Sequence, residues 1–140
     1  MALHLIKLAV GVDDLPHLRK LQKERRRERG RSVFYTRHMP RRSEEILEGG
    51  SIYWVIKGHI RVRQRILGFV PVVEEDGERY TLVRYDPKLV ETAWQPKRPF
   101  QGWRYLLPKD APPDRLSRGG KEEDRLPEAM AQELRSLGLL

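Results

Sequence analysis

The stretch SIYWVIKGHIRVRQRILGFVPVVEEDGERYTLVRY, residues 51–85, decides the fold. Aromatic and β-branched residues dominate three runs within it, as is typical of strands. Gly58 separates the first two runs, and the residues EDGE at 75–78 are typical of a hairpin turn. We therefore predict three consecutive antiparallel strands. Their ranges are 51–57, 59–73 and 79–86.

Outward from this centre, shorter elements are expected on both sides. Asp13 or Asp14 can cap a helix that carries Pro16 in its first turn and ends at Gly30. Ser43 can cap a helical turn that ends at Gly49-Gly50. Further strands are predicted over 2–10, 33–36 and 103–107. The fold class is α+β: a mostly antiparallel, curved sheet or small barrel with peripheral helices.

Length and composition indicate a single domain. The chain has 140 residues, which is enough for one hydrophobic core. The absence of cysteine excludes disulfides, thiolate metal ligands and cysteine catalysis. No apolar run reaches the roughly 18 residues that span a bilayer, so we expect a cytoplasmic protein with no membrane partner. The expected organisation is a domain over 1–107, a loop or tether over 108–126 and a docked helix over 127–140.

Positive charge is concentrated in the first half of the chain. The net charge is +8, and residues 19–42 contain 11 Lys or Arg against Glu24 and Glu28. Such clustering is typical of proteins that meet a polyanion. A biased genome explains why arginine exceeds lysine, but it does not explain why the basic residues cluster.

Two groups of arginines are candidates for phosphate contacts. Arg61, Arg63 and Arg65 would share one face of a strand, with the alternate residues Ile60, Val62 and Ile66 on the other. Such a row can follow a phosphate backbone, or it can be a solvated face balanced by Glu74 or Glu78. The helix segment KERRRERGR at 23–31 contributes Arg25, Arg26 and Arg27. It can face phosphates, or be an exposed helix end with internal ion pairs.

The aromatic residues offer stacking surfaces. Trp54 and Trp103 lie in predicted strands with arginines nearby, and either ring can stack on a base or pack in the core. The four histidines lack metal-ligand spacing, and no nucleophile motif or phosphate-binding glycine loop is present. No catalytic residue, cofactor or metal is therefore predicted, and the sequence leans away from an enzyme.

Two resemblances add to these residue patterns. The segments MALHLIKLAVGVDDL, SIYWVIKGHIRVRQRILG and RPFQGWRYL, with DAP after the last, resemble a bacterial, mainly alphaproteobacterial, family of unknown function. More weakly, EEILEGGSIYWVIKG and DPKLVETAWQPKRPF resemble PUA-like barrels of the EVE type. The second resemblance implies RNA binding, with a base held in an aromatic pocket.

The leading hypothesis is therefore a nucleic-acid-binding module that takes RNA in preference to DNA. Its expected contacts are Arg25, Arg26, Arg27, Arg37, Arg61, Arg63, Arg65, Trp54, Trp103 and Arg104. One alternative is an enzyme or binding protein for a phosphorylated or acidic small molecule, with a closed pocket. Its lining would be Arg37, His38, Lys57 and Arg104. Another is a protein that docks on an acidic partner through residues 15–29.

Overall fold

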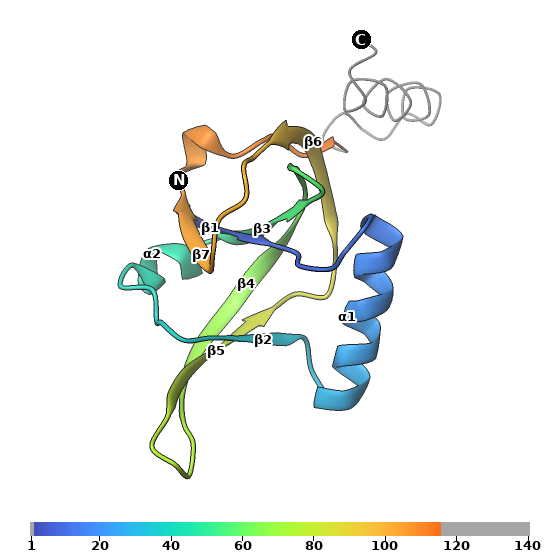
Figure 1. Cartoon of the computed structure of the whole chain (residues 1–140). Helices are drawn as coiled ribbons and strands as arrows, with labels where there is room; N and C mark the ends of the chain where they lie inside the picture. The colour runs from blue at the N-terminus through green and yellow to red at the C-terminus, as the bar shows by residue number, and fades with distance from the viewer. Residues whose placement is uncertain (1, 116–140) are drawn as a thin grey trace.

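The computed structural model describes residues 2–115, which form a twisted sheet with one long helix beside it (Figure 1). The strands are β1 (His4–Leu8), β2 (Val33–Thr36), β3 (Ser51–Ile56), β4 (His59–Val73), β5 (Arg79–Tyr85), β6 (Val90–Pro96) and β7 (Trp103–Leu106). The helices are α1 (Leu15–Arg29) and α2 (Ser43–Leu47), with a 3-10 turn at Pro108–Asp110. The predicted C-terminal helix and residues 116–126 of the predicted tether lie outside the described residues.

The seven strands form one sheet in the order β2-β5-β4-β3-β1-β7, with β6 also paired to β4. Among the strand pairs of residues 2–115, only β1 and β3 are parallel to each other; the other pairs are antiparallel. The α+β prediction is confirmed. The barrel alternative is wrong, because the end strands β2 and β7 do not pair and the sheet stays open.

The long strand β4 organises the sheet. Its first half lies between β3 and β6, and its second half pairs with β5. The three predicted central strands are confirmed, and the hairpin turns at Gly77, whose φ of 87° favours glycine. Within the turn, the backbone N–H of Glu74 donates to the carbonyl of Glu78 at 2.8 Å. The projecting hairpin is visible at the bottom of Figure 1.

A β-bulge at Arg61 interrupts the predicted row of arginines. Ile60 is opposite Val55, but Val62 is opposite Trp54, so the two strands change register at this point. Ile60 accordingly packs in a different hydrophobic cluster from Val62. The expected alternation of all three arginines on one face is therefore wrong, because an extra residue in one strand shifts the side chains that follow it.

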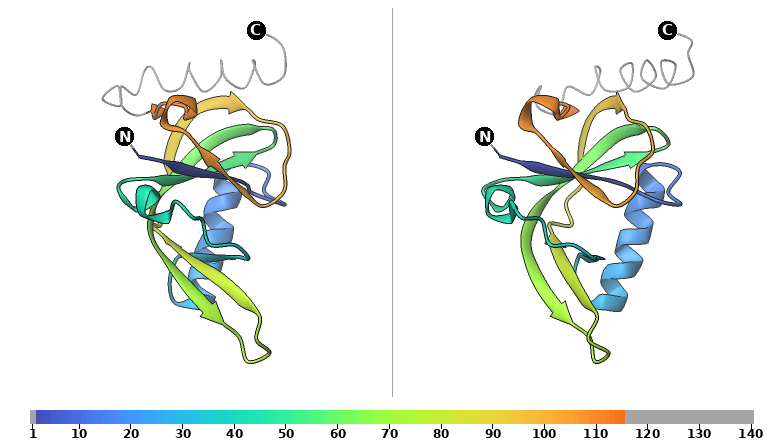
Figure 2. Two further views of the ribbon diagram at one scale, coloured as in Figure 1. Left: turned by 90° about the vertical axis from the view of Figure 1, so that its left-hand side faces the viewer. Right: turned by 60° about the vertical axis from the view of Figure 1, so that its left-hand side comes forward.

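Each face of the sheet carries a hydrophobic cluster. On one face Leu5, Ile52 and Trp54 pack with Leu18 of α1 and Val83 of β5. On the opposite face the fully or nearly fully buried residues are Ile6, Tyr53, Val55, Ile60 and Leu106. Figure 2 shows α1 running along the first of these faces. Gln22 and Arg25 of this helix line a cavity between α1 and the strands.

The helix signals in the sequence are mostly confirmed. Asp14 caps α1 by accepting a 2.8 Å hydrogen bond from the N–H of His17, and Gly30 ends it with φ 77°. The expected cap at Ser43 is wrong: Ser43 is the first helical residue of α2, and Arg42 precedes it without a capping side chain. None of the helices within residues 2–115 is long and apolar enough to cross a membrane.

Strand β6 was not predicted from the sequence, and it anchors the start of the predicted tether. The N–H of Ala93 donates to the carbonyl of Pro113 at 2.8 Å, and Thr92 forms a β-bridge with Asp114. Arg63 closes this contact with two hydrogen bonds to the Asp114 carboxylate, at 2.6 and 2.7 Å. Residues 108–115 thus lie against the body of the domain.

Candidate functional site

Lys7 lies between two tryptophans on the face of the sheet that α1 partly covers. Its register partner in β3 is Trp54, and its partner in β7 is Trp103. Because register partners project from the same face, the three side chains form a row across β3, β1 and β7. A half-buried lysine between indoles places a positive charge among flat aromatic surfaces.

Among residues 2–115, no carboxylate forms an ion pair with Lys7. Burial lowers the pKa of Lys7, and the positive charge of Arg25 on α1 lowers it further. Within residues 2–115 neither Lys7 nor Arg25 forms an ion pair. Two cations held together in this way attract an anion, which would relieve their mutual repulsion.

A cavity of about 150 Å³ opens beside Lys7, between α1 and the sheet. Aromatic rings from three strands line it: Phe34 and Tyr35 of β2, Trp54 of β3 and Tyr85 of β5. Burial raises the pKa of Tyr85, while the charges of Arg25, Arg29 and Arg26 act in the opposite direction. The basic end of α1 therefore faces an aromatic cavity.

A buried amide network holds the wall of this cavity in place. Oε1 of Gln64 accepts hydrogen bonds from the indole Nε1 of Trp54 at 2.9 Å and from Nε2 of Gln22 at 2.8 Å. Nε2 of Gln64 donates to Oε1 of Gln22 and to the carbonyls of Asp86 and Pro87. An indole only donates and a carbonyl only accepts, so both amides have a single satisfactory orientation.

A wider cavity of about 730 Å³ adjoins the first and shares Lys7 and Tyr35 with it. Arg37, His38 and Trp103 also line this second space. Trp103 Nε1 donates a 3.2 Å hydrogen bond to the backbone carbonyl of His38, which ties the loop after β2 to β7. Tyr85 lines the first cavity, Trp103 lines the second, and Lys7 lines both; we call the two cavities together the Lys7 trough.

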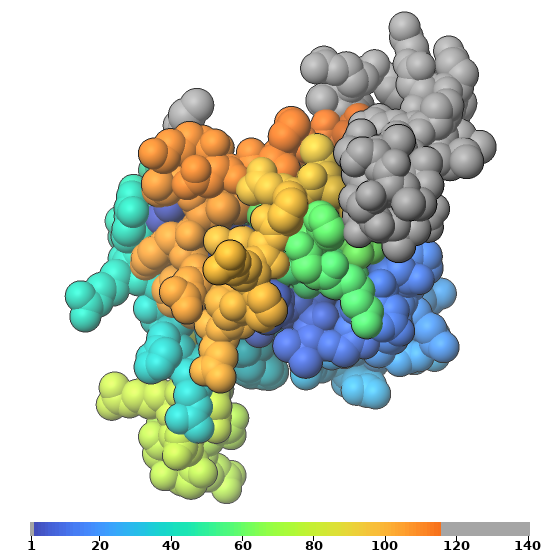
Figure 3. Space-filling model, turned by 45° about the horizontal axis from the view of Figure 1, so that its top comes forward, coloured from blue at the N-terminus to red at the C-terminus, as the bar shows by residue number. Residues whose placement is uncertain are grey.

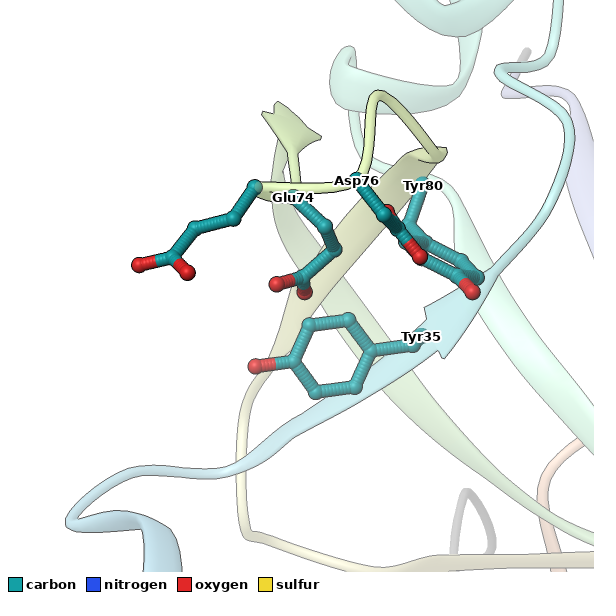
Figure 4. Close-up of a pocket in the computed structure, with 5 residues that line it drawn as sticks. Tyr35, Glu74, Asp76 and Tyr80 are labelled. Atoms are coloured by element: carbon teal, nitrogen blue, oxygen red, sulfur yellow. The ribbon is translucent and has the colours of Figure 1, made fainter.

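An acidic cavity of about 590 Å³ lies on the hairpin side of Tyr35. Glu74, Glu75 and Asp76 line it together with Tyr35 and Tyr80. Figure 4 shows the Glu74 carboxylate beside the Tyr35 ring and Asp76 beside Tyr80. The charge thus changes sign across Tyr35, so an anion in the Lys7 trough is repelled by the hairpin turn.

The model of the family DUF1489, described as proteins of unknown function, matches residues 5–140. The chain belongs to the DUF1489 family. No curated protein and no solved structure matches it. The resemblance to an uncharacterised family is thereby confirmed, whereas the PUA-like and EVE-type resemblance finds no support for this DUF1489 protein.

Four of the predicted contact residues come together around the Lys7 trough of this DUF1489 protein. They are Arg25, Arg37, Trp54 and Trp103. On α1, Arg27 is exposed and Arg26 is half-buried, which agrees with the exposed helix end of the alternative. Neither forms an ion pair within the described chain, so the internal pairs of that alternative are not observed for them.

The other predicted arginines lie elsewhere. The Arg61 guanidinium stacks 3.9 Å from the centroid of the Trp94 ring, and burial lowers its pKa while the charge of Asp14 raises it. Arg63 is bound to Asp114 and Ser51. Arg65 is exposed, and Arg104 projects from the opposite face beside Phe100. Neither Glu74 nor Glu78 forms an ion pair with any of these arginines.

The closed pocket of the small-molecule alternative does not form as predicted. Arg37 and His38 line the Lys7 trough, but Arg104 lines a different cavity. Lys57 is paired with Asp13 at 3.2 Å and lines neither. Within residues 2–115, no cluster of three or more histidine or carboxylate residues could hold a metal ion.

Sequence reasoning missed the residue at the centre of the site, Lys7, and its neighbours Gln22, Phe34 and Tyr85. The sequence pattern could have identified Lys7, because it shares a strand face with the apolar residues Leu3 and Leu5, where a charged side chain is unexpected. Gln22 could have been identified in a similar way, because it falls beside the apolar stripe of α1. The contribution of β2 and β5 depends on long-range pairing that the sequence pattern does not show.

Proposed function

We propose that this protein binds single-stranded nucleic acid, with RNA preferred to DNA, in the Lys7 trough. One unstacked base would enter the aromatic cavity under α1, and neighbouring phosphates would contact Lys7, Arg25 and Arg37. RNA is favoured because proteins recognise it mainly through splayed bases that stack on aromatic side chains.

The observation that carries the proposal is the pair Lys7 and Arg25 beside Trp54. Two cations that form no ion pair within residues 2–115 supply attraction for phosphates, and rings lining a cavity supply a surface for a base. A stacked base contributes about 1–3 kcal/mol, and each phosphate contact adds a dependence on salt. The acidic hairpin turn supports the same direction, because it would confine a polyanion to the side of Tyr35 that faces Lys7.

The test compares Lys7→Met with Lys57→Met, a matched control in which the lost lysine is exposed and paired with Asp13. Fluorescence anisotropy with a labelled single-stranded RNA of about twelve nucleotides is measured over a salt series. Lys7→Met should weaken binding and lower the slope of log affinity against log salt by roughly 0.7, the value for one lost contact to a single strand. Lys57→Met should bind as the wild type does.

Two results would count against the proposal. One is the absence of binding to any RNA or DNA strand at low salt. The other is equal affinity of the two variants, because the trough would then play no part in binding.

A phosphorylated small molecule is a second candidate, favoured by the small size of the cavity beside Trp54, about 150 Å³. In that case a mononucleotide would bind as tightly as the twelve-nucleotide RNA, and the Lys7→Met substitution would weaken both equally. Tighter binding of the longer strand favours the nucleic-acid proposal.

A further inference from the structure

A second cation-rich cavity lies on the face of the sheet opposite α1. It has a volume of about 490 Å³ and lies between β6, β7 and the 3-10 turn. Ile6, Ile60 and Leu106 form its apolar floor. Figure 3 shows the surface made by the chain from β6 through residues 97–110, coloured yellow to orange.

Three cations line this cavity: Lys97, Arg104 and Lys109. Two of them contact the Phe100 ring, with Lys97 Nζ at 5.9 Å and Arg104 Cζ at 5.6 Å from its centroid. None of the three cations forms an ion pair within residues 2–115. Asp110 is the single carboxylate among the described residues that line the cavity. The balance of charge therefore favours an anion.

The edge strand β7 separates this cavity from the Lys7 trough. Trp103 is paired with Lys7 and faces the trough, whereas Arg104 is paired with Ile6 and faces the second cavity. Successive strand residues project to opposite faces, so the two anion-attracting spaces lie back to back across one strand. The segment Gln101–Gly102, just before β7, is exposed and lines the trough, so it offers a route from one face to the other.

We propose that the cavity of Lys97, Arg104 and Lys109 is a second phosphate-binding site, and that a bound strand reaches it by passing around the start of β7. This inference rests on the proposed function and extends it. A short strand would occupy the Lys7 trough alone. A longer strand would contact both faces, with a sugar or base over the apolar floor and its phosphate among the three cations.

The test uses a triple variant, Lys97→Ala, Arg104→Ala and Lys109→Ala, against a control of equal charge. The control is Arg79→Ala, Arg84→Ala and Lys88→Ala, three exposed residues that line neither the Lys7 trough nor the second cavity. Binding of RNA strands of about four and about twelve nucleotides is measured for both proteins. Thermal melts establish that both are folded.

The longer strand should distinguish the two proteins. We expect the triple variant to bind it at least about tenfold more weakly than the control, with a salt slope lower by roughly 2, as for three lost contacts to a single strand. Both proteins should bind the four-nucleotide strand with equal affinity.

Equal binding of the long strand by both proteins would overturn the second site. The proposed function would survive that result, provided that Lys7→Met still weakens binding. A mononucleotide that binds the wild type and Lys7→Met equally, but not the triple variant, would assign the cavity to a free phosphorylated molecule and overturn the extended path. Failure of every strand to bind the wild type would reject both proposals together.

Discussion

The indole N–H of Trp54 in β3 donates a 2.9 Å hydrogen bond to Oε1 of Gln64 in β4, whose side chain is fully buried. Gln64 lies between Val62 and Ile66 in a strand whose inward positions are otherwise apolar. Its amide is satisfied at both ends, by Trp54 and Gln22 on one side and by two backbone carbonyls on the other. One polar side chain thus connects α1, β3 and the segment after β5 beneath the candidate site.

We expect Gln64→Met to destabilise the protein by about 2–4 kcal/mol, because a group left unsatisfied after burial costs about 1–3 kcal/mol. The indole of Trp54 and the amide of Gln22 would both lose partners. Urea denaturation measures the loss, and Gln101→Met, at an exposed position, is the control. Equal stability of the two variants would show that the network contributes little.

Gly50 should be intolerant of any side chain. A Cβ at this position would overlap the backbone carbonyl oxygens of Leu3 and Ile46. Leu3 directly precedes β1, and Ile46 lies in α2. We expect Gly50→Ala to cost at least about 3 kcal/mol, at the upper end for overpacking, since backbone cannot move aside as a side chain can. The matched control is Gly68→Ala, whose added Cβ would meet nothing closer than Arg84 Nη1 at 3.7 Å. Similar melting temperatures for the two variants would contradict this reading.

Stability should fall as the pH drops below about 6.5, in part through His4. Burial lowers the pKa of His4, the charge of Arg63 lowers it further, and Asp114 acts in the opposite direction. The unfolded chain then binds more protons than the folded one between the folded pKa and the ordinary value of 6.5. The contribution of His4 to the free energy of unfolding is fully present above pH 6.5 and is lost as the pH falls through the folded pKa.

The control for this pH dependence is His4→Asn. Nδ1 of His4 accepts a 3.0 Å hydrogen bond from the N–H of Ser51, and an asparagine Oδ1 can accept the same bond without titrating. The stability of this variant should change less between pH 7.5 and 5.5, in the range where histidine titrates. If chemical denaturation gives the wild type and His4→Asn the same dependence of stability on pH, His4 is not the cause of the loss.

The sequence predicted those elements whose causes are local. The alternating runs of β3, β4 and β5, the Asp14 cap and Gly30 each act over a few residues, and all were confirmed. Strand β6 was missed because it gains its partners from β4 and residues 113–114, far along the chain. The bulge at Arg61 was missed for the same reason, since only the facing strands reveal a register shift.

The candidate site was less predictable than the fold. The sequence identified cations and aromatic residues as types, and four of ten named residues meet at the Lys7 trough. It did not distinguish Arg25, which faces Lys7, from Arg63, which is bound to Asp114. The two arginines look alike in the sequence. Their different surroundings depend on the arrangement of β1 beside β3 and β7, which only the structure shows.

The position of β1 has a consequence for how the protein is made. This strand lies between β3 and β7 in the sheet. Its residue His4 pairs with Leu106, which is about 100 residues later in the sequence. Contacts of such long range form slowly, because the intervening chain must be ordered first. During synthesis β1 would keep an open edge until β7 leaves the ribosome. A chain stopped before Trp103 would expose that edge to other strands, so we expect aggregation to concentrate among incomplete chains.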